Sequence, residues 1–101
     1  MKTYITIAGT RYYYGTDIFR KGMEVRLIKE PKNEVDRDAI RVEVQGLGKV
    51  GYVANSVYTV KGESVSASRL YEHIGKKADA KVTAVIPGGV ICAVRGKSLR
   101  K

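Results

Sequence analysis

The stretch from Leu27 to Val44 constrains the fold of this chain more than any other part of the sequence. Residues 40–44 alternate apolar and polar side chains, which is the period of two expected of a β-strand with one buried face. Pro31 lacks a backbone donor and restricts φ, so a strand that precedes it should end at Glu30. The stretch therefore predicts two strands joined by a polar loop.

Similar short apolar runs, bounded by glycine or proline, recur along the chain. They predict strands over residues 2–8, 23–30, 40–44, 49–53, 78–86 and 90–94. Residues 66–74 are the best helix candidate, because Ser66 or Ser68 can cap the start and Gly75 can end it. Residues 55–62 are compatible with a strand or with a helix start. This order predicts a mostly β fold, an OB-like antiparallel barrel of about six strands with one or two short inserted helices.

Length and composition indicate one domain. The 101 residues are close to the commonest domain size, and we expect the domain to occupy residues 1–95, followed by a frayed basic tail over residues 96–101. The one cysteine, Cys92, lies in an apolar run and should be a core residue. The N-terminal residues lack the apolar run of a secretion signal, and no segment is long enough to cross a bilayer. We therefore expect a cytoplasmic protein without a membrane partner.

The net charge points to a polyanionic partner. Nineteen Lys and Arg against ten Asp and Glu give a formal charge of +9. Such an excess favours nucleic acid first and an anionic membrane second, and the alternative is a soluble protein that happens to be basic. Because the basic residues are dispersed, they indicate a folded basic surface rather than a disordered arm.

The segment Arg11-Tyr12-Tyr13-Tyr14 is the most informative candidate for ligand binding. Tyrosine rings stack on nucleobases, and an arginine can bind a phosphate or stack as a plane. On a regular strand Tyr12 and Tyr14 would point to one side and Tyr13 to the other, so all three reach one ligand only if the backbone is irregular. We expect at least one of them to contact a ligand; the alternative is that one or two belong to the barrel wall.

Acidic residues cluster in the loop after the second predicted strand, at Glu30, Glu34, Asp36 and Asp38. A nuclease could use such carboxylates to hold Mg²⁺. Their spacing matches no metal motif, however, and Lys32 and Arg37 offset part of the charge. We favour a solvated turn in which Asp36 bonds to the backbone. The sequence predicts no metal, no cofactor and no catalytic residues, and His73 should be a surface residue.

Three segments together carry a family resemblance. They are Gly9-Thr10-Arg11-Tyr12-Tyr13, the pattern Pro-x-Asn-x-x-Asp-x-x-Ala-Ile-x-Val over residues 31–42, and Val50-Gly51-Tyr52-Val53. The chain resembles the HIRAN domain over about residues 5–94, and is expected to be a stand-alone member of the bacterial type. The resemblance implies an OB-like barrel that binds DNA and, as in members fused to fork-remodelling ATPases, grips the 3′ end of a single strand.

The resemblance also implies roles for individual residues. By position, Arg11, Tyr12 and Tyr13 would hold the terminal nucleotides, and Asp36 would meet the 3′-hydroxyl with Asn33 close by. A carboxylate accepts a hydrogen bond from a free hydroxyl and repels a continuing phosphate, so it can distinguish a strand end from an interior position.

The chain departs from the family's pattern at Val35, Tyr52, Asn55 and Gly88. The family often has aromatic residues at the first and last of these positions, and its DNA-binding members have basic or imidazole side chains at the other two. The grip on the end is therefore expected to be weakened, or rebuilt from Tyr14, Arg37, Lys49 and Tyr52.

The sequence thus predicts a non-catalytic module that binds single-stranded DNA at 3′ ends, linked to DNA repair or replication-fork processing, with a DNA-processing enzyme in trans as a candidate partner. The alternatives are a protein-interaction module that uses the same groove for a peptide and, third, a metal-dependent nuclease. Nothing in the sequence indicates an oligomeric state.

Overall fold

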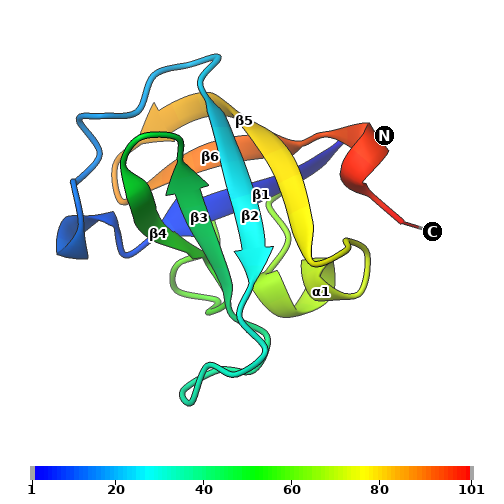
Figure 1. The fold of residues 1–101 in the computed structure, drawn as a ribbon. Coiled ribbons are helices and arrows are strands. Elements are labelled where there is room, and N and C mark those ends of the chain that lie inside the picture. The colour runs from blue at the N-terminus through cyan, green and yellow to red at the C-terminus, as the bar shows by residue number, and fades with distance from the viewer. Residues whose placement is uncertain (1, 101) are drawn as a thin grey trace.

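Six strands close into an antiparallel barrel in the order β1-β4-β3-β2-β5-β6 (Figure 1). The computed structural model describes residues 2–100. Its elements are β1 (Thr3–Ala8), the 3₁₀ turn η1 (Thr10–Tyr12), β2 (Glu24–Lys29), β3 (Ile40–Val44), β4 (Gly48–Val53), α1 (Ala67–Tyr71), β5 (Lys77–Ile86), β6 (Gly89–Val94) and the 3₁₀ turn η2 (Gly96–Ser98). The predicted mostly β, OB-like barrel is confirmed. No helix within the described residues is long and apolar enough to span a membrane.

The apolar positions of the strands meet inside the barrel. Ile5, Leu27, Val42 and Val90 are fully inaccessible to solvent, and burying such a side chain contributes about 1.5–3 kcal/mol. Cys92 is also buried, as predicted, and its burial raises the pKa of the thiol to about 12. A thiol with so high a pKa is unreactive at neutral pH, so Cys92 acts as a small core residue.

The helix is shorter than the predicted segment 66–74. Ser66 caps it, because its Oγ accepts a hydrogen bond from the Arg69 N–H at 3.2 Å. The chain leaves the helix after Tyr71, yet Leu70 and Ile74 are both buried in the core. Residues 55–62, for which the sequence allowed strand or helix, form hydrogen-bonded turns instead.

The predicted fraying of the C-terminal tail is wrong for residues 96–100, and Lys101 lies outside the described residues. Leu99 pairs with Ile74 in an isolated β-bridge and packs against the core. The Asp79 N–H donates a hydrogen bond to Ser98 Oγ at 3.1 Å. The Leu99 side chain and the backbone contacts with Ile74 and Asp79 hold the segment against the barrel. The basic composition of the tail does not indicate these contacts.

The barrel closes along a short seam between β1 and β4. Only two residue pairs form it, Ile7 with Val53 and Ala8 with Tyr52. At this seam a Cβ on Gly51 would lie 2.8 Å from the Ala8 carbonyl oxygen and 2.8 Å from Ile7 Cγ2. Gly51 therefore lets the end of β1, and with it η1, lie directly against β4.

The substitution Gly51→Ala tests this close contact. Because backbone must move to admit the methyl group, we expect a loss of about 1–3 kcal/mol in the free energy of unfolding, measured by urea denaturation. Gly75→Ala is the matched control, since a Cβ there meets no atom within 4 Å. Equal stability of the two variants would show that the seam relaxes without cost.

Candidate nucleic-acid interface

The tyrosine segment is an irregular turn and not a strand. Gly9 adopts a left-handed conformation with φ 72°, and the Tyr13 and Gly15 N–H groups both donate to the Thr10 carbonyl at 2.9 and 2.8 Å. Strand alternation therefore does not apply. Figure 1 shows η1 projecting from the end of β1. The side chains of Tyr12, Tyr13 and Tyr14 are 72%, 40% and 48% exposed.

One contact positions each of these tyrosines while leaving the ring accessible. The Arg11 guanidinium donates to the Tyr12 hydroxyl at 2.8 Å and lies 4.9 Å from its ring centre. The Tyr14 hydroxyl donates to the Leu47 carbonyl at 3.2 Å. The Tyr13 ring centre lies 6.0 Å from Lys49 Nζ. The structure thus exposes three aromatic rings on this turn, with Arg11 beside Tyr12 and Lys49 near Tyr13.

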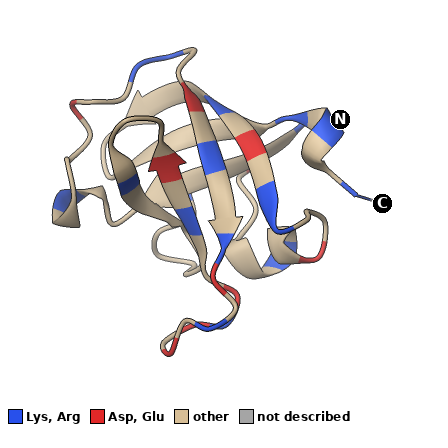
Figure 2. Ribbon diagram, viewed as in Figure 1, with Lys and Arg blue, Asp and Glu red and all other residues tan. Residues whose placement is uncertain are grey.

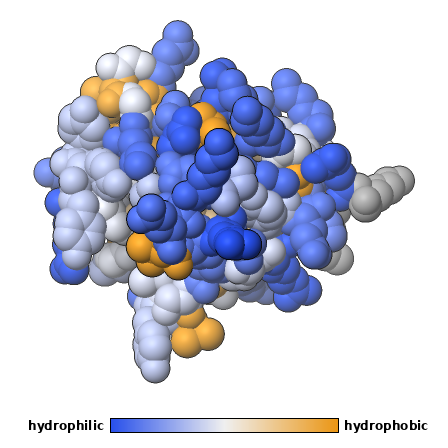
Figure 3. Space-filling model, turned by 60° about the horizontal axis from the view of Figure 1, so that its bottom comes forward, coloured by the Kyte–Doolittle hydropathy of each residue, from blue (hydrophilic) through white to orange (hydrophobic). Residues whose placement is uncertain are grey.

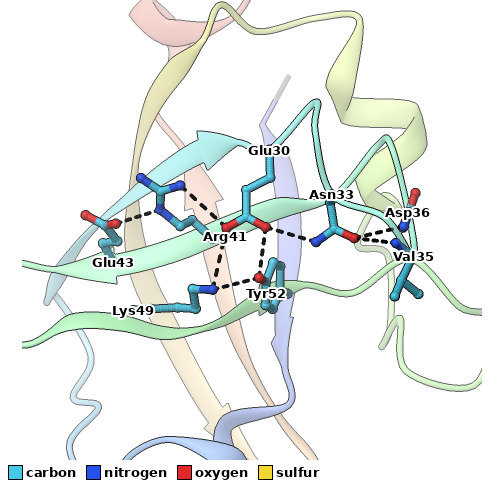
Figure 4. Close-up of polar contacts among 8 residues, drawn as sticks. All are labelled: Glu30, Asn33, Val35, Asp36, Arg41, Glu43, Lys49 and Tyr52. Carbon is cyan, nitrogen blue, oxygen red and sulfur yellow. Dashed lines mark hydrogen bonds and ion pairs between the residues drawn. The ribbon is translucent and has the colours of Figure 1, made fainter.

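Beside this surface, four side chains converge on the Glu30 carboxylate (Figure 4). Glu30 Oε1 accepts hydrogen bonds from Asn33 Nδ2 at 3.0 Å and from the Tyr52 hydroxyl at 2.9 Å. Its Oε2 lies 3.4 Å from an Arg41 nitrogen and 3.6 Å from Lys49 Nζ. Only 16% of the Glu30 side chain is exposed. We call these five residues the Glu30 cluster.

An irregularity in the β3–β4 ladder brings two members of the cluster to one face. Arg41 is opposite Tyr52 and Glu43 is opposite Lys49, with a shift of register between the two pairs. Residues two apart on a strand share a face, and directly opposite residues do too. Lys49 and Tyr52, which are three residues apart, therefore point the same way, and Lys49 Nζ donates to the Tyr52 hydroxyl at 2.8 Å.

These contacts set the charge of the cluster. Partial burial alone would raise the pKa of the Glu30 carboxyl, but the hydrogen bonds from Asn33 and Tyr52, together with Lys49 and Arg41, lower it below its usual value. The bond to Tyr52, assisted by Glu30, raises the pKa of Lys49. Burial raises the pKa of Tyr52. At neutral pH the cluster therefore holds one carboxylate, two cations and a neutral phenol.

The loop after β2 is ordered by its own polar side chains. Asn33 Oδ1 accepts hydrogen bonds from the Val35 and Asp36 N–H groups, both at 2.9 Å. Asp36 Oδ1 accepts from the Asp38 N–H at 2.9 Å, and its Oδ2 accepts from Asn55 Nδ2 at 2.8 Å. The predicted backbone bond of Asp36 is confirmed. Because a carboxylate offers about four lone-pair sites, the partly exposed Asp36 retains acceptor capacity for a ligand.

The structure brings most of the predicted site residues together. A connected series of contacts runs from η1 to the loop through Tyr13, Lys49 and Tyr52, and then through Glu30 to Asn33 and Asp36. Arg37 is exposed and makes no side-chain hydrogen bond or ion pair within residues 2–100. Val35 is 97% exposed. No group of three or more His, Cys, Asp or Glu in the described part of the chain could hold a metal ion.

Sequence reasoning missed three residues of this arrangement as site residues. Glu30 was expected only as a strand end and a loop acid, Arg41 only as an outward strand residue, and Asn55 only as a departure from the family. Asn55 Oδ1 accepts from the Ser68 N–H at 2.8 Å, so its amide nitrogen is directed at Asp36. One sequence feature could have identified Glu30 as a site residue: it ends a strand before Pro31, and the next two strands carry the cations Arg41 and Lys49.

Comparisons with known proteins agree with this fold. The HIRAN domain family matches residues 2–65 of the chain, which confirms the resemblance inferred from the sequence. A crystal structure of a protein from Lactobacillus plantarum is similar with a TM-score of 0.63 and 23% identity, covering 91% of this chain and 88% of that one. The crystal structure of the HIRAN domain of human HLTF has a TM-score of 0.62 and 18% identity, covering 92% and 74%. The chain has no match among the curated proteins.

The substitution Glu30→Gln tests the cluster. It removes the charge that Lys49 and Arg41 face, so we expect the free energy of unfolding to fall by about 1–3 kcal/mol at neutral pH. Because the pKa of Glu30 is lowered from 4.5, its contribution is complete above that pH and is lost as the pH falls through the lower value. The gap between wild type and variant should therefore close in acid, as measured by urea unfolding across pH. Glu34→Gln, at an exposed position of the same loop, should show no such gap.

Proposed function

We propose that this chain, which belongs to the HIRAN domain family, is a non-catalytic module that binds single-stranded DNA at or near a 3′ end. The observation that supports this most is the exposed tyrosine turn η1 placed beside Lys49 and Tyr52, next to the loop that carries Asp36. As part of the same proposal, the module acts in DNA repair or replication-fork processing, where its partner is a DNA-processing enzyme encoded as a separate chain.

The tyrosine turn supplies the base contacts. Exposed aromatic rings stack on bases of any sequence, each contributing about 1–3 kcal/mol. Tyr12 is the most exposed of the three and its hydroxyl accepts a hydrogen bond from the Arg11 guanidinium, so the pair can take a base and its phosphate together. Tyr14 and Tyr52 are tied by their hydroxyls to Leu47 and Glu30, and they act as fixed walls.

The loop supplies the preference for an end. Asp36 is held by Asp38 and Asn55 in a loop that Asn33 orders from within. A 3′-hydroxyl can donate to the remaining lone pairs of its carboxylate. A continuing phosphate brings like charge to the same place, and such juxtaposition costs up to several kcal/mol across an interface. Because Val35 stands where the family often has an aromatic residue, the tyrosines of η1 provide the stacking on the terminal base.

The substitution Tyr12→Ala should weaken binding to a 3′-hydroxyl oligonucleotide by about 1–3 kcal/mol, because a stacking surface is lost. Tyr12→Phe is the control, since it keeps the ring and removes only the hydroxyl that Arg11 contacts. Both are measured by fluorescence anisotropy. If wild type, Tyr12→Ala and Tyr12→Phe are all folded and bind DNA equally, η1 is not part of the site. That result would favour the alternative that the groove binds a peptide.

The substitution Asp36→Asn separates the charge from the turn. The amide oxygen can still accept from the Asp38 N–H, although the bond from Asn55 Nδ2 is lost because an amide nitrogen replaces its acceptor. The repulsion of a phosphate is gone. We expect the ratio of affinities for 3′-hydroxyl and 3′-phosphate oligonucleotides to narrow by about tenfold, or ~1.4 kcal/mol. Asp38→Asn, in the same loop, should leave this ratio unchanged. An unchanged ratio in Asp36→Asn with reduced thermal stability would assign Asp36 to the turn alone.

A further inference from the structure

Most of the net positive charge comes from the last part of the chain. Residues 64–101 carry eight Lys and Arg against two Asp and Glu, which is six of the nine net charges. Around the site, by contrast, Lys49 and Arg41 both face Glu30, and Arg41 also pairs with Glu43. Figure 2 shows the acidic loop between β2 and β3 at this end of the barrel. At the site, Arg11 and Arg37 have no acidic partner among the described residues, whereas the charges of Lys49 and Arg41 are offset by Glu30.

A second group of cations gathers on another part of the surface. Two shallow hollows lie on either side of Leu99. Their basic lining residues are Lys2, Lys81, Arg95 and Lys97 in one, and Arg69 and Arg100 in the other. We call these six residues the C-terminal basic face. Figure 1 shows η2 and both chain ends on the opposite side of the barrel from η1.

Few acids offset this face. Glu24 pairs with Arg95, and Asp79 lies 4.0 Å from Arg26. Lys2, Lys81 and Lys97 are exposed and form no ion pair within residues 2–100. The docking of Leu99 and Ser98 holds the segment that carries Lys97 and Arg100, so these charges are presented in a fixed arrangement.

We propose that the C-terminal basic face is a second DNA-binding surface, which contacts the phosphate backbone without regard to strand ends. This inference rests on the proposed function. It assigns general affinity for DNA to the C-terminal basic face and the preference for strand ends to the face that carries η1 and Asp36. Phosphate contacts by Lys and Arg supply affinity that does not depend on sequence. None of the large exposed hydrophobic side chains of the described residues belongs to this face, so it offers no stacking surface for bases and no side chain that would insert into a membrane. Figure 3, which views one side of the molecule, likewise shows only small separate hydrophobic patches on a hydrophilic surface.

The double substitution Lys81→Ala/Lys97→Ala tests this surface, with Arg20→Ala/Lys21→Ala as a control that removes the same charge from an exposed turn. The probes are circular single-stranded DNA and linear oligonucleotides with a 3′-hydroxyl or a 3′-phosphate. Each single-strand phosphate contact contributes about 0.7 to the slope of log K against log salt, so losing two should flatten the slope by ~1.4. Over a fourfold rise in salt, the variant should lose roughly sevenfold less affinity than wild type.

The expected result is weaker binding of the variant to all three probes, with an unchanged ratio between the two linear ends, and a smaller effect in the control. Equal behaviour of variant and control would overturn the proposal, because total charge would then explain the binding. It would also be overturned if Lys81→Ala/Lys97→Ala abolished binding to phosphatidylserine vesicles and left DNA binding intact. Failure of the proposed function is seen separately, as absence of any end preference in wild type.

Discussion

The contact between β1 and β4 at Gly51 is the constraint on which the rest of the arrangement depends. The barrel closes there over two residue pairs, and a side chain at Gly51 would meet the β1 backbone. Closure sets where β1 ends and therefore where η1 begins. It also places Tyr52 at the seam, opposite both Ala8 and Arg41. The tyrosine turn and the Glu30 cluster are neighbours because the barrel closes at this point.

The Glu30 cluster connects the elements that surround the proposed site. Its members come from the end of β2, from the following loop, from β3 and from β4. Each pair alone would contribute little at a surface, but a carboxylate that is largely buried and bonded by four partners restricts all of them together. The cluster therefore fixes the spacing between Tyr13, beside Lys49, and Asp36, beside Asn33.

The ion pairs and hydrogen bonds of the Glu30 carboxylate affect the electrostatics of the site. Lys49 and Arg41 compensate its charge, so they contribute less to the attraction of phosphates than their number suggests. On the C-terminal basic face, Lys2, Lys81 and Lys97 form no ion pair within the described residues, and Glu24, which pairs with Arg95 and lies opposite Lys81, is the acid that partly offsets them. Under our proposals, the end of the barrel that carries Glu30 recognises strand ends by stacking and by the Asp36 carboxylate, while the C-terminal basic face adds affinity that varies with salt.

The sequence by itself determined the strands, the capped helix and the family. Period-two alternation in residues 40–44 and glycine or proline between the apolar runs are local signals, and the barrel follows from them. Only the tertiary structure decided which polar residues meet. Alternation applied to Lys49 and Tyr52 would separate them, and the register shift in β3–β4 places them together. The docking of Leu99 on Ile74 and the bond from Asn55 to Asp36 likewise join residues far apart in the chain. Such contacts depend on barrel closure, and no local pattern encodes them.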